Sequence, residues 1–200
     1  MAKSSDKLTA LFETAVEEHS AAVARFARRS GVLEKDRLDV VANVFITAWN
    51  RRETFDPRCK IKPWLLGIAR CACSNYWQSV RTSGEVLAHD TLDKMAAGGV
   101  FNPEAAAIAR EERELLGELI TWLPAERRDP LLLHLEGCTA EEIAAELGIL
   151  PNTASARIRL ALRDLEDEMQ RRRARDKRHA PQTKTALQSR SVSRIAIEKL

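Results

Sequence analysis

The residues between 152 and 163 combine hydrogen-bonding and basic side chains at helical spacing, a chemistry suited to reading duplex DNA. Arginine binds guanine through two hydrogen bonds or holds a backbone phosphate, and the N–H groups at a helix N-terminus also attract phosphate. The candidate DNA contacts are Asn152, Thr153, Ser155, Arg157, Arg159 and Arg163. The alternative is an ordinary helical hairpin whose basic face is solvated.

The segment that must position these residues has the layout of a helix-turn-helix, which places its second helix in the major groove. Thr139 followed by Glu142 predicts a capping box at the start of the first helix, and Gly148 predicts a tight turn at its end. The apolar positions expected between the two helices are Ile143, Ala144, Leu147, Ile149, Ala154 and Ile158. This combination favours DNA binding over the plain hairpin.

The sequence shows no spacing typical of a catalytic or metal site. It contains neither a Gly-rich phosphate loop nor a nucleophile with a base at a recognisable distance. Cys71 and Cys73 fall on one predicted helix and point about 200 degrees apart, so they cannot readily hold one ion. We therefore expect no enzyme activity, no cofactor and no metal.

The composition predicts a helical protein that stays in the cytoplasm. Hydrophobic residues make up 44% of the 200 residues and aromatic residues only 5%. The formal charge is +3, but residues 170–190 hold eight Lys or Arg and one Asp, a net +7 that leaves −4 elsewhere. No apolar run suits a membrane span and no signal peptide is visible, so membrane insertion is not expected. The four scattered cysteines indicate reduced thiols.

Apolar residues at helical spacing predict helices along most of the chain. The expected helices cover residues 7–29, 36–51, 63–78, 104–122, 125–136, 140–147 and 151–172. Asp36 is the expected N-cap of the second helix, and a short helix is also conceivable near 87–95, where periodicity otherwise fades.

The predicted fold is all-α, with two small helical domains joined by a flexible linker and a helix-turn-helix in the second domain. The expected divisions are a helical domain at 1–82, a linker at 83–103, a helix-turn-helix domain at 104–172 and a basic, disordered tail at 173–200.

The second domain resembles region four of sigma-70-class sigma factors of RNA polymerase. The resemblance rests on Leu123–Arg128 (LPAERR), on Leu131–Gly137 (LLLHLEG) and on the helix-turn-helix that follows. Their order is similar to that of the extracytoplasmic-function (ECF) group, whose members have two domains joined by a linker.

The first domain independently resembles region two of the same family. Asp39–Trp49 (DVVANVFITAW) is similar to the helix that grips the polymerase clamp helices, and Phe55–Pro57 with Ile61–Arg70 is similar to the segment that melts the promoter. The implied polymerase contacts are Asp39, Val40, Ala42, Asn43 and Ile46. The implied contacts with the minus-ten element are Lys62, Arg70, Cys71, Asn75, Tyr76, Trp77 and Arg81.

The resemblance implies a sigma factor that directs core RNA polymerase to specific promoters and helps to open them. Region two would open the minus-ten element, and region four would read the minus-thirty-five element through the six residues at 152–163. The implied partners are promoter DNA and the clamp helices and flap of core RNA polymerase. Many family members are held inactive by an anti-sigma factor, so such a partner is also implied, although no residue here requires it.

The sequence departs from the family pattern at several of these positions. Ala42 and Asn43 stand where the family usually has Gln and Glu, and Cys71 stands where Asn is common. Positions that are often basic hold Ser155, Leu160 and Leu162. The promoter sequence therefore cannot be copied from relatives.

Two other functions fit part of the sequence. A stand-alone helix-turn-helix regulator with a helical sensor domain would bind duplex DNA without polymerase, but the clamp-like block at 39–49 argues against it. A protein-binding adaptor is disfavoured by the arginines of the recognition helix. The basic run at 171–175 either extends DNA or polymerase contact or is a solvated tail.

The aromatic residues have competing interpretations. Trp64 is in phase with Leu65 and Ile68, which favours a place in the core over a contact with DNA. Tyr76 and Trp77 are adjacent, so one of them is expected to be exposed, where it could stack on a melted base.

Overall fold

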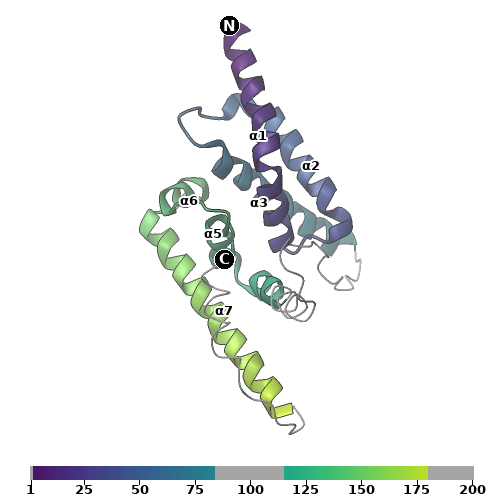
Figure 1. Ribbon diagram of the computed structural model, residues 1–200, viewed down its shortest axis with the longest axis vertical. Helices are drawn as coiled ribbons and strands as arrows, with labels where there is room; N and C mark the ends of the chain where they lie inside the picture. The colour runs from purple at the N-terminus through teal and green to yellow at the C-terminus, as the bar shows by residue number, and fades with distance from the viewer. Residues whose placement is uncertain (1, 84–114, 180–200) are drawn as a thin grey trace, which may run out of the picture.

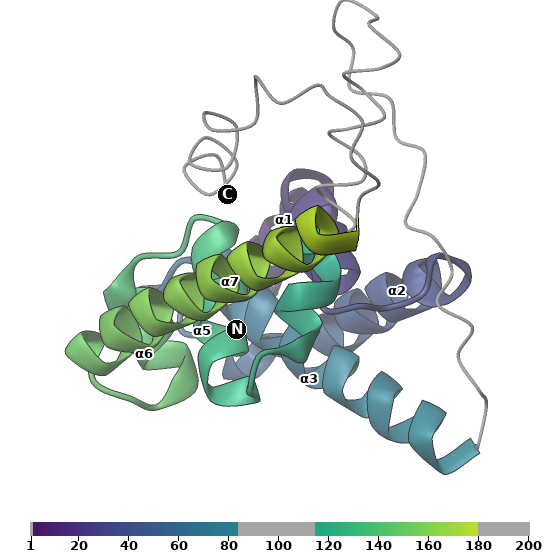
Figure 2. The same ribbon diagram turned by 90° about the horizontal axis from the view of Figure 1, so that it is seen from below.

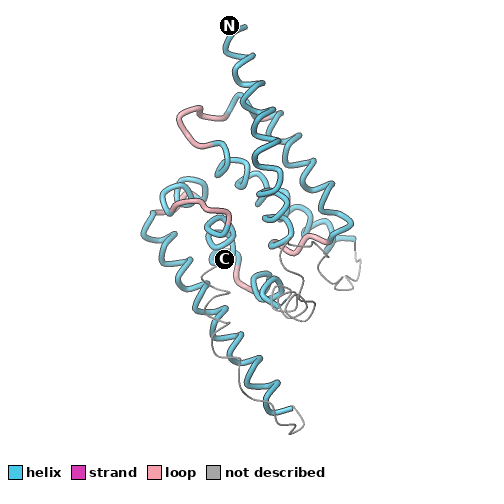
Figure 3. Tube along the Cα trace, in the orientation of Figure 1, coloured by secondary structure: helices cyan, strands magenta, loops and turns pink. Residues whose placement is uncertain are grey.

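The computed structural model describes residues 2–83 and 115–179, and every regular element in these two stretches is a helix (Figure 3). The first stretch holds α1 (Ala2–Arg29), α2 (Glu34–Asn50), the 3-10 helix η1 (Arg52–Thr54) and α3 (Ile61–Ser83). The second holds a helical segment at 115–122, then α5 (Ala125–Leu135), α6 (Ala140–Leu147) and α7 (Pro151–His179). The all-α prediction is confirmed. The short helix suggested near 87–95 lies outside the described residues.

The helices α1, α2 and α3 pack against one another into a first unit (Figure 1). Each presents an apolar stripe, because residues three or four apart share one face of a helix. Phe26 of α1, Val44 of α2 and Leu65 of α3 are at most 1% exposed. None of the described helices is long and apolar enough to cross a bilayer.

Three aromatic rings gather around Phe12 of α1. Its ring centroid lies 5.7 Å from that of Trp64, 6.3 Å from Phe55 and 6.4 Å from Trp49, each pair nearly edge-on. Trp64 packs against the core through this cluster, so its predicted place in the core is confirmed.

Tyr76 and Trp77 correct another expectation, because neither is fully exposed. The Tyr76 hydroxyl donates to the Asp36 carboxylate at 2.9 Å, and the Trp77 indole N–H donates to the Ser30 carbonyl at 2.9 Å. Two adjacent helical residues can both be half-buried because each reaches sideways to the turn between α1 and α2.

The second unit is built around α7, whose first half packs against α5 and α6. Leu131, Leu132 and Leu133 are consecutive and all at most 1% exposed. A helix on a surface buries only one face, so three buried residues in a row mean that α5 is covered on more than one side. It contacts α6 and α7 on its own unit and α1 and α3 on the first.

The boundaries of two helices differ from the expected ones. The helix α2 begins at Glu34 after Leu33, so the predicted N-cap Asp36 lies in the first turn instead, where it accepts the Tyr76 hydrogen bond. The helix α7 continues to His179 rather than ending near residue 172. The predicted disordered tail therefore begins with a helical segment, and residues 180–200 lie outside the described part of the chain.

The two units touch through α1 and α3 of the first and α5 and α6 of the second. In Figure 1, α5 and α6 lie between α7 and α3, and Figure 2 gives the view from below. This contact decides which of the predicted functional residues are accessible.

Candidate nucleic-acid interface

The helix-turn-helix is fixed at both ends of its first helix, α6. The Thr139 hydroxyl accepts the Glu142 N–H at 3.3 Å, and the Glu142 carboxylate accepts the Thr139 N–H at 2.9 Å. At the other end Gly148 has φ +64°, the left-handed conformation that a glycine adopts without strain. The predicted capping box and turn are both confirmed, and together they set the direction in which α7 leaves α6.

The packing between α6 and α7 determines which face of α7 is free. Ile143 and Ala144 of α6 are 0% and 3% exposed, and Ala154 and Ile158 of α7 are 0% and 7% exposed. Small alanines on both helices allow their backbones to approach closely. Because 154 and 158 point inward, the opposite face of α7, which holds Asn152, Arg159 and Arg163, turns toward solvent.

The six predicted contacts with the minus-thirty-five element all have solvent access. Asn152, Arg159 and Arg163 are exposed, whereas Thr153, Ser155 and Arg157 are half-buried. Within the described stretches no carboxylate pairs with Arg157, Arg159 or Arg163, in contrast to Arg127, which pairs with Asp164. The three arginines are therefore available to an external anion.

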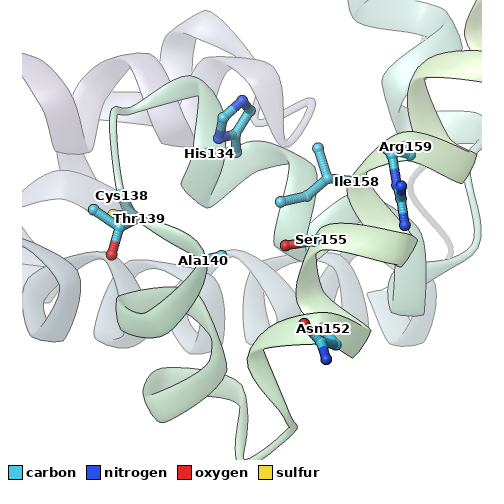
Figure 4. A pocket seen from close by; sticks show the side chains of 8 residues that line it. All are labelled: His134, Cys138, Thr139, Ala140, Asn152, Ser155, Ile158 and Arg159. Carbon is cyan, nitrogen blue, oxygen red and sulfur yellow. The ribbon is translucent and has the colours of Figure 1, made fainter.

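A hollow of about 500 Å³ opens on this face of the second unit (Figure 4). Three of the predicted residues, Asn152, Ser155 and Arg159, line it from α7. The opposite wall comes from the end of α5 and the start of α6 and includes His134 and Thr139. The sequence analysis missed these two as lining residues, because only the fold brings the α5 end beside the recognition helix.

The residues predicted to contact the minus-ten element divide between two faces of α3. Cys71, Asn75 and Arg81 are exposed. Lys62 donates a hydrogen bond to the Glu136 carbonyl, and Arg70 lies 3.6 Å from the Asp129 carboxylate. Both of these partners belong to the second unit.

Trp77 also lies on the side of α3 that faces the second unit, whereas Tyr76 is hydrogen-bonded to Asp36 within the first unit. A Cβ added at Gly31 would lie 3.1 Å from the Trp77 ring and 2.8 Å from the Thr121 methyl, which places both side chains over the turn after α1. Gly31 has φ +81°, so the turn itself requires glycine.

The residues predicted to contact polymerase lie along α2, and four of the five are exposed. Asp39, Ala42, Asn43 and Ile46 face solvent, whereas Val40 is 8% exposed and belongs to the core. The same face also presents Leu38, 81% exposed, and Trp49, 40% exposed, which the sequence analysis did not single out for polymerase. Large apolar side chains exposed next to one another are typical of surfaces that bind another protein.

The cysteines and histidines form no metal site in the part of the chain that the structure describes. Cys59 and Cys71 are exposed, whereas Cys73 and Cys138 are 3% exposed. Burial raises the pKa of both buried thiols to about 11. Their side chains are therefore neutral near pH 7 and poor ligands or nucleophiles.

Comparisons with known proteins agree with this geometry. Residues 15–82 match the family Sigma-70 region 2, and residues 113–165 match Sigma-70, region 4. The RNA polymerase sigma factor CnrH of Cupriavidus metallidurans is 30% identical over 153 residues, which cover 74% of this chain and 80% of that protein. The ECF RNA polymerase sigma factor RpoE of Cereibacter sphaeroides is 28% identical over 148 residues, or 72% of this chain and 78% of that protein.

A solved structure supports the fold. The sigma factor RpoE from Bartonella quintana, solved in complex with the anti-sigma factor NepR, superposes with a TM-score of 0.62 at 20% identity and covers 80% of this chain and 96% of that one. The two matched regions occur in the order, and on the helices, that the motifs predicted. The chain therefore belongs to the ECF group of sigma-70-class RNA polymerase sigma factors, which direct polymerase to promoters.

Proposed function

We propose that the accessible face of α7 reads the minus-thirty-five element as duplex DNA. The supporting observation is that Ala154 and Ile158 are buried, while Asn152 before them and Arg159 and Arg163 after them are exposed. Ser155 and Arg159 line the same hollow as His134, so α5 contributes to this surface. Arginine and asparagine side chains here supply the bidentate hydrogen bonds that distinguish bases.

The exposed side of α3 is proposed to contact the opened minus-ten element through Cys71, Asn75 and Arg81. A thiol at position 71 is a weaker hydrogen-bond partner than an amide, so the base preference there is expected to differ from that of relatives with Asn. Lys62 and Arg70 would join this surface only after α5 moves away, and Trp77 only after the segment that holds Thr121 does.

The exposed face of α2 is proposed to bind the polymerase clamp helices. Its polar members are Asp39 and Asn43, and its apolar members include Leu38, Ala42 and Ile46. An apolar strip with polar groups beside it is typical of a protein interface.

The remaining roles follow from family membership. The protein is proposed to work in the cytoplasm beside the polymerase and to catalyse no reaction itself, so that phosphodiester synthesis belongs to the core enzyme. Because a related sigma factor has been solved with an anti-sigma factor, we also propose such a partner for this chain. The proposed divisions remain 1–82, 83–103, 104–172 and 173–200, with the last now beginning as helix.

The test is transcription in vitro with purified core RNA polymerase, this protein and a library of genomic promoter fragments. The variant Arg157→Ala/Arg159→Ala is expected to lose most specific transcripts, with about 1 to 3 kcal/mol lost for each good base contact. The matched control is Arg171→Ala/Arg175→Ala, which removes the same charge from the same helix beyond the matched region.

Comparing the two variants distinguishes base-specific contacts from general electrostatic attraction to DNA. Equal losses in both would mean that α7 supplies only positive charge, and the proposed base contacts would be wrong. Duplex binding with neither transcript nor polymerase association would instead favour a stand-alone regulator.

A further inference from the structure

The helix α7 continues well beyond the part of the chain that matches Sigma-70, region 4. The match ends at residue 165, whereas α7 runs to His179, which is about 21 Å further along the helix axis. Residues 171–179, which we call the basic extension, hold six Lys or Arg and one Asp, a net +5 with His neutral. In Figure 1 the yellow end of α7 projects beyond the other helices. The basic run is therefore part of a helix.

Buried and paired residues fix the direction in which the basic extension runs. Leu165 and Met169 are 3% and 6% exposed, so one side of α7 packs onto the second unit as far as residue 169. Three residues later, Nη1 of Arg172 donates to the Glu118 carboxylate at 3.1 Å. Glu118 belongs to the helical segment at 115–122, so this pair ties the extension to a second helix. The side chains around Arg172 therefore keep a defined place on the surface.

Two arginines of the basic extension face solvent on the side of α7 that also holds a proposed DNA contact. Arg171 and Arg175 are both exposed. Arg175 follows Arg157 by 18 residues, about five turns, so the two lie on one side of the helix about 27 Å apart. Arg171 lies 3.4 Å from Glu168, but its side chain is 70% exposed, and such a surface pair contributes little.

The basic extension concentrates like charge to a degree that helix stability does not explain. Arg171 and Arg175 are four residues apart, a spacing at which like charges on a helix repel each other. Cations at a helix C-terminus are stabilised by the helix dipole, but this effect is confined to the last turn. Arg171 lies about two turns before the end at His179. A polyanion beside the helix would relieve the repulsion.

The exposed side chains of the basic extension favour a polyanion over a protein as the partner. The core of a protein interface contains large apolar or aromatic side chains. Among the described residues of α7 that follow Leu160, no large apolar side chain is exposed. The backbone of duplex DNA carries one negative charge for about every 1.7 Å of its axis, so a row of cations is complementary to it.

The length of α7 brings the basic extension to the DNA backbone rather than to the bases. A straight helix that begins in the major groove, which is about 12 Å wide, cannot follow its curve over about five turns. The extension therefore leaves the groove beside a sugar-phosphate backbone while the first turns of α7 remain in it. Phosphate contacts need positive charge and carry no base sequence.

We propose that the basic extension of α7 binds backbone phosphates of duplex DNA that flank the minus-thirty-five element. Arg171 and Arg175 contact phosphate, and Arg172 is a positioning residue that holds the extension on the second unit. This inference rests on the proposed reading of the minus-thirty-five element by α7, because the first turns of the helix bring the extension to the duplex. The extension adds affinity that does not depend on base sequence.

The first experiment measures binding of the full chain to a fluorescein-labelled, mixed-sequence duplex by anisotropy at several salt concentrations. The variant Arg171→Ala/Arg175→Ala is expected to bind about tenfold more weakly at about 0.1 M salt. The slope of the logarithm of the binding constant against the logarithm of the salt concentration should fall by about 1 to 2, since each phosphate contact contributes about 0.9. A slope equal to that of the wild type would overturn the proposal.

Two further variants test whether charge at these positions is what matters. Arg171→Lys/Arg175→Lys should keep the wild-type slope, because attraction to phosphate requires the charge rather than the guanidinium group. The matched control Lys35→Ala/Arg51→Ala removes the same charge from exposed positions of the first unit and should also keep it. A fall in the control as large as that in Arg171→Ala/Arg175→Ala would show that only net charge counts, and the proposal would fail.

Circular dichroism shows whether the alanine variant keeps its helix. If it does not, Glu168→Gln takes its place, because it removes the carboxylate beside Arg171 and should strengthen duplex binding. Its matched control is Glu53→Gln, an exposed residue of η1. Equal duplex affinities of Glu168→Gln and Glu53→Gln would overturn the phosphate contact.

The second experiment measures association of the wild type and of Arg171→Ala/Arg175→Ala with core RNA polymerase in the absence of DNA. Equal affinities are expected. A weaker association, together with an unchanged salt slope on DNA, would assign the basic extension to a protein partner and overturn the proposal.

Failure of this proposal is distinguishable from failure of base reading. A mixed-sequence duplex tests phosphate contacts alone, whereas the effect of Arg157→Ala/Arg159→Ala on transcription tests the bases. In that transcription assay, Arg171→Ala/Arg175→Ala is expected to weaken all promoters by a similar factor rather than to change which promoters are used.

Discussion

The two surfaces proposed to contact promoter DNA differ in what lies opposite them. On α7, Arg159 and Arg163 are exposed and face no carboxylate within the described residues. On α3, Lys62 and Arg70 are paired with groups of α5 and of the residue that follows it. Both surfaces carry the residue types that bind nucleic acid, so residue type alone does not decide whether a basic side chain is accessible to DNA.

The difference shows how one acidic pair of helices serves two purposes. The inner sides of α5 and α6 support the recognition helix through Leu133 and Ile143, each 0% exposed. Their outer sides carry Glu136 and Glu146 toward α1 and α3. The same two helices thus leave α7 open to solvent and cover α3. Substitutions on their inner sides are therefore expected to affect the α7 surface, and substitutions on their outer sides the α3 surface.

The largest expected effect comes from Ile143→Ala in α6. Removing this fully buried side chain leaves a cavity beneath the recognition helix and should lower the free energy of unfolding by about 2 to 5 kcal/mol. Leu150→Ala is the control, since Leu150 is 72% exposed in the neighbouring turn. Thermal denaturation measures both, and a similar loss in the two would contradict the packing described for α6 and α7.

A smaller effect is expected at the contact of Gly67 with Glu146. The substitution Gly67→Ala should displace the carboxyl group and loosen the units in the wild type, whereas in a Glu146→Ala background it should stabilise α3 by improving helix propensity. The expected coupling is about 1 to 2 kcal/mol in a double-mutant cycle of unfolding free energies. Additive effects would mean that the two residues do not touch in solution.

The capping box offers a test confined to the α7 surface. Thr139→Ala removes the hydroxyl that accepts the Glu142 N–H and should cost about 1 kcal/mol. Thr139→Ser keeps the hydroxyl and should cost much less. The readout is chemical denaturation, and a loss in Thr139→Ser as large as that in Thr139→Ala would contradict the role given to the hydroxyl.

The smallest expected effect is a pH dependence from Glu146. Burial raises its pKa to about 7, above the ordinary 4.5, and Arg70 only partly opposes this. The folded state therefore favours the protonated form, so its stabilising contribution is complete below about pH 4.5 and is lost as the pH rises through 7. Burial raises the pKa of Asp129 too, which acts in the same direction.

The difference in the free energy of unfolding between the wild type and Glu146→Gln, measured by thermal denaturation, should therefore change between pH 5 and 7.5, by less than about 1 kcal/mol after solvent screening. In Glu166→Gln, an exposed control on α7, no such change is expected. A pH-independent difference would place the Glu146 carboxyl group in water rather than on α3.

Much of the second unit could be predicted from sequence, because its signals are local. Thr139 with Glu142 and Gly148 at the turn fix the ends of α6 through bonds that span three or four residues. Ala154 and Ile158 mark the buried face of α7 by helical spacing alone. Such features depend on near neighbours in the chain, so the pattern of residues carries them directly.

Other features could not be predicted from the sequence because they depend on residues that are distant in the chain. The family resemblance grouped Lys62, Arg70 and Trp77 with Asn75, but could not indicate that the second unit lies against the first three. Nor could periodicity show that both Tyr76 and Trp77 find hydrogen-bond acceptors at Asp36 and Ser30. These partners are 40 and 47 residues away in the chain, and only packing brings them close.

The sequence by itself determined the helices, the helix-turn-helix and the sigma-factor family, because helical periodicity, capping and motif order are properties of neighbouring residues. Tertiary structure alone decided that Glu136 would be buried between Arg25 and Arg29, more than 100 residues away. The physical reason is that a cation binds whichever anion the fold brings within reach, and a string of residues does not specify that distance.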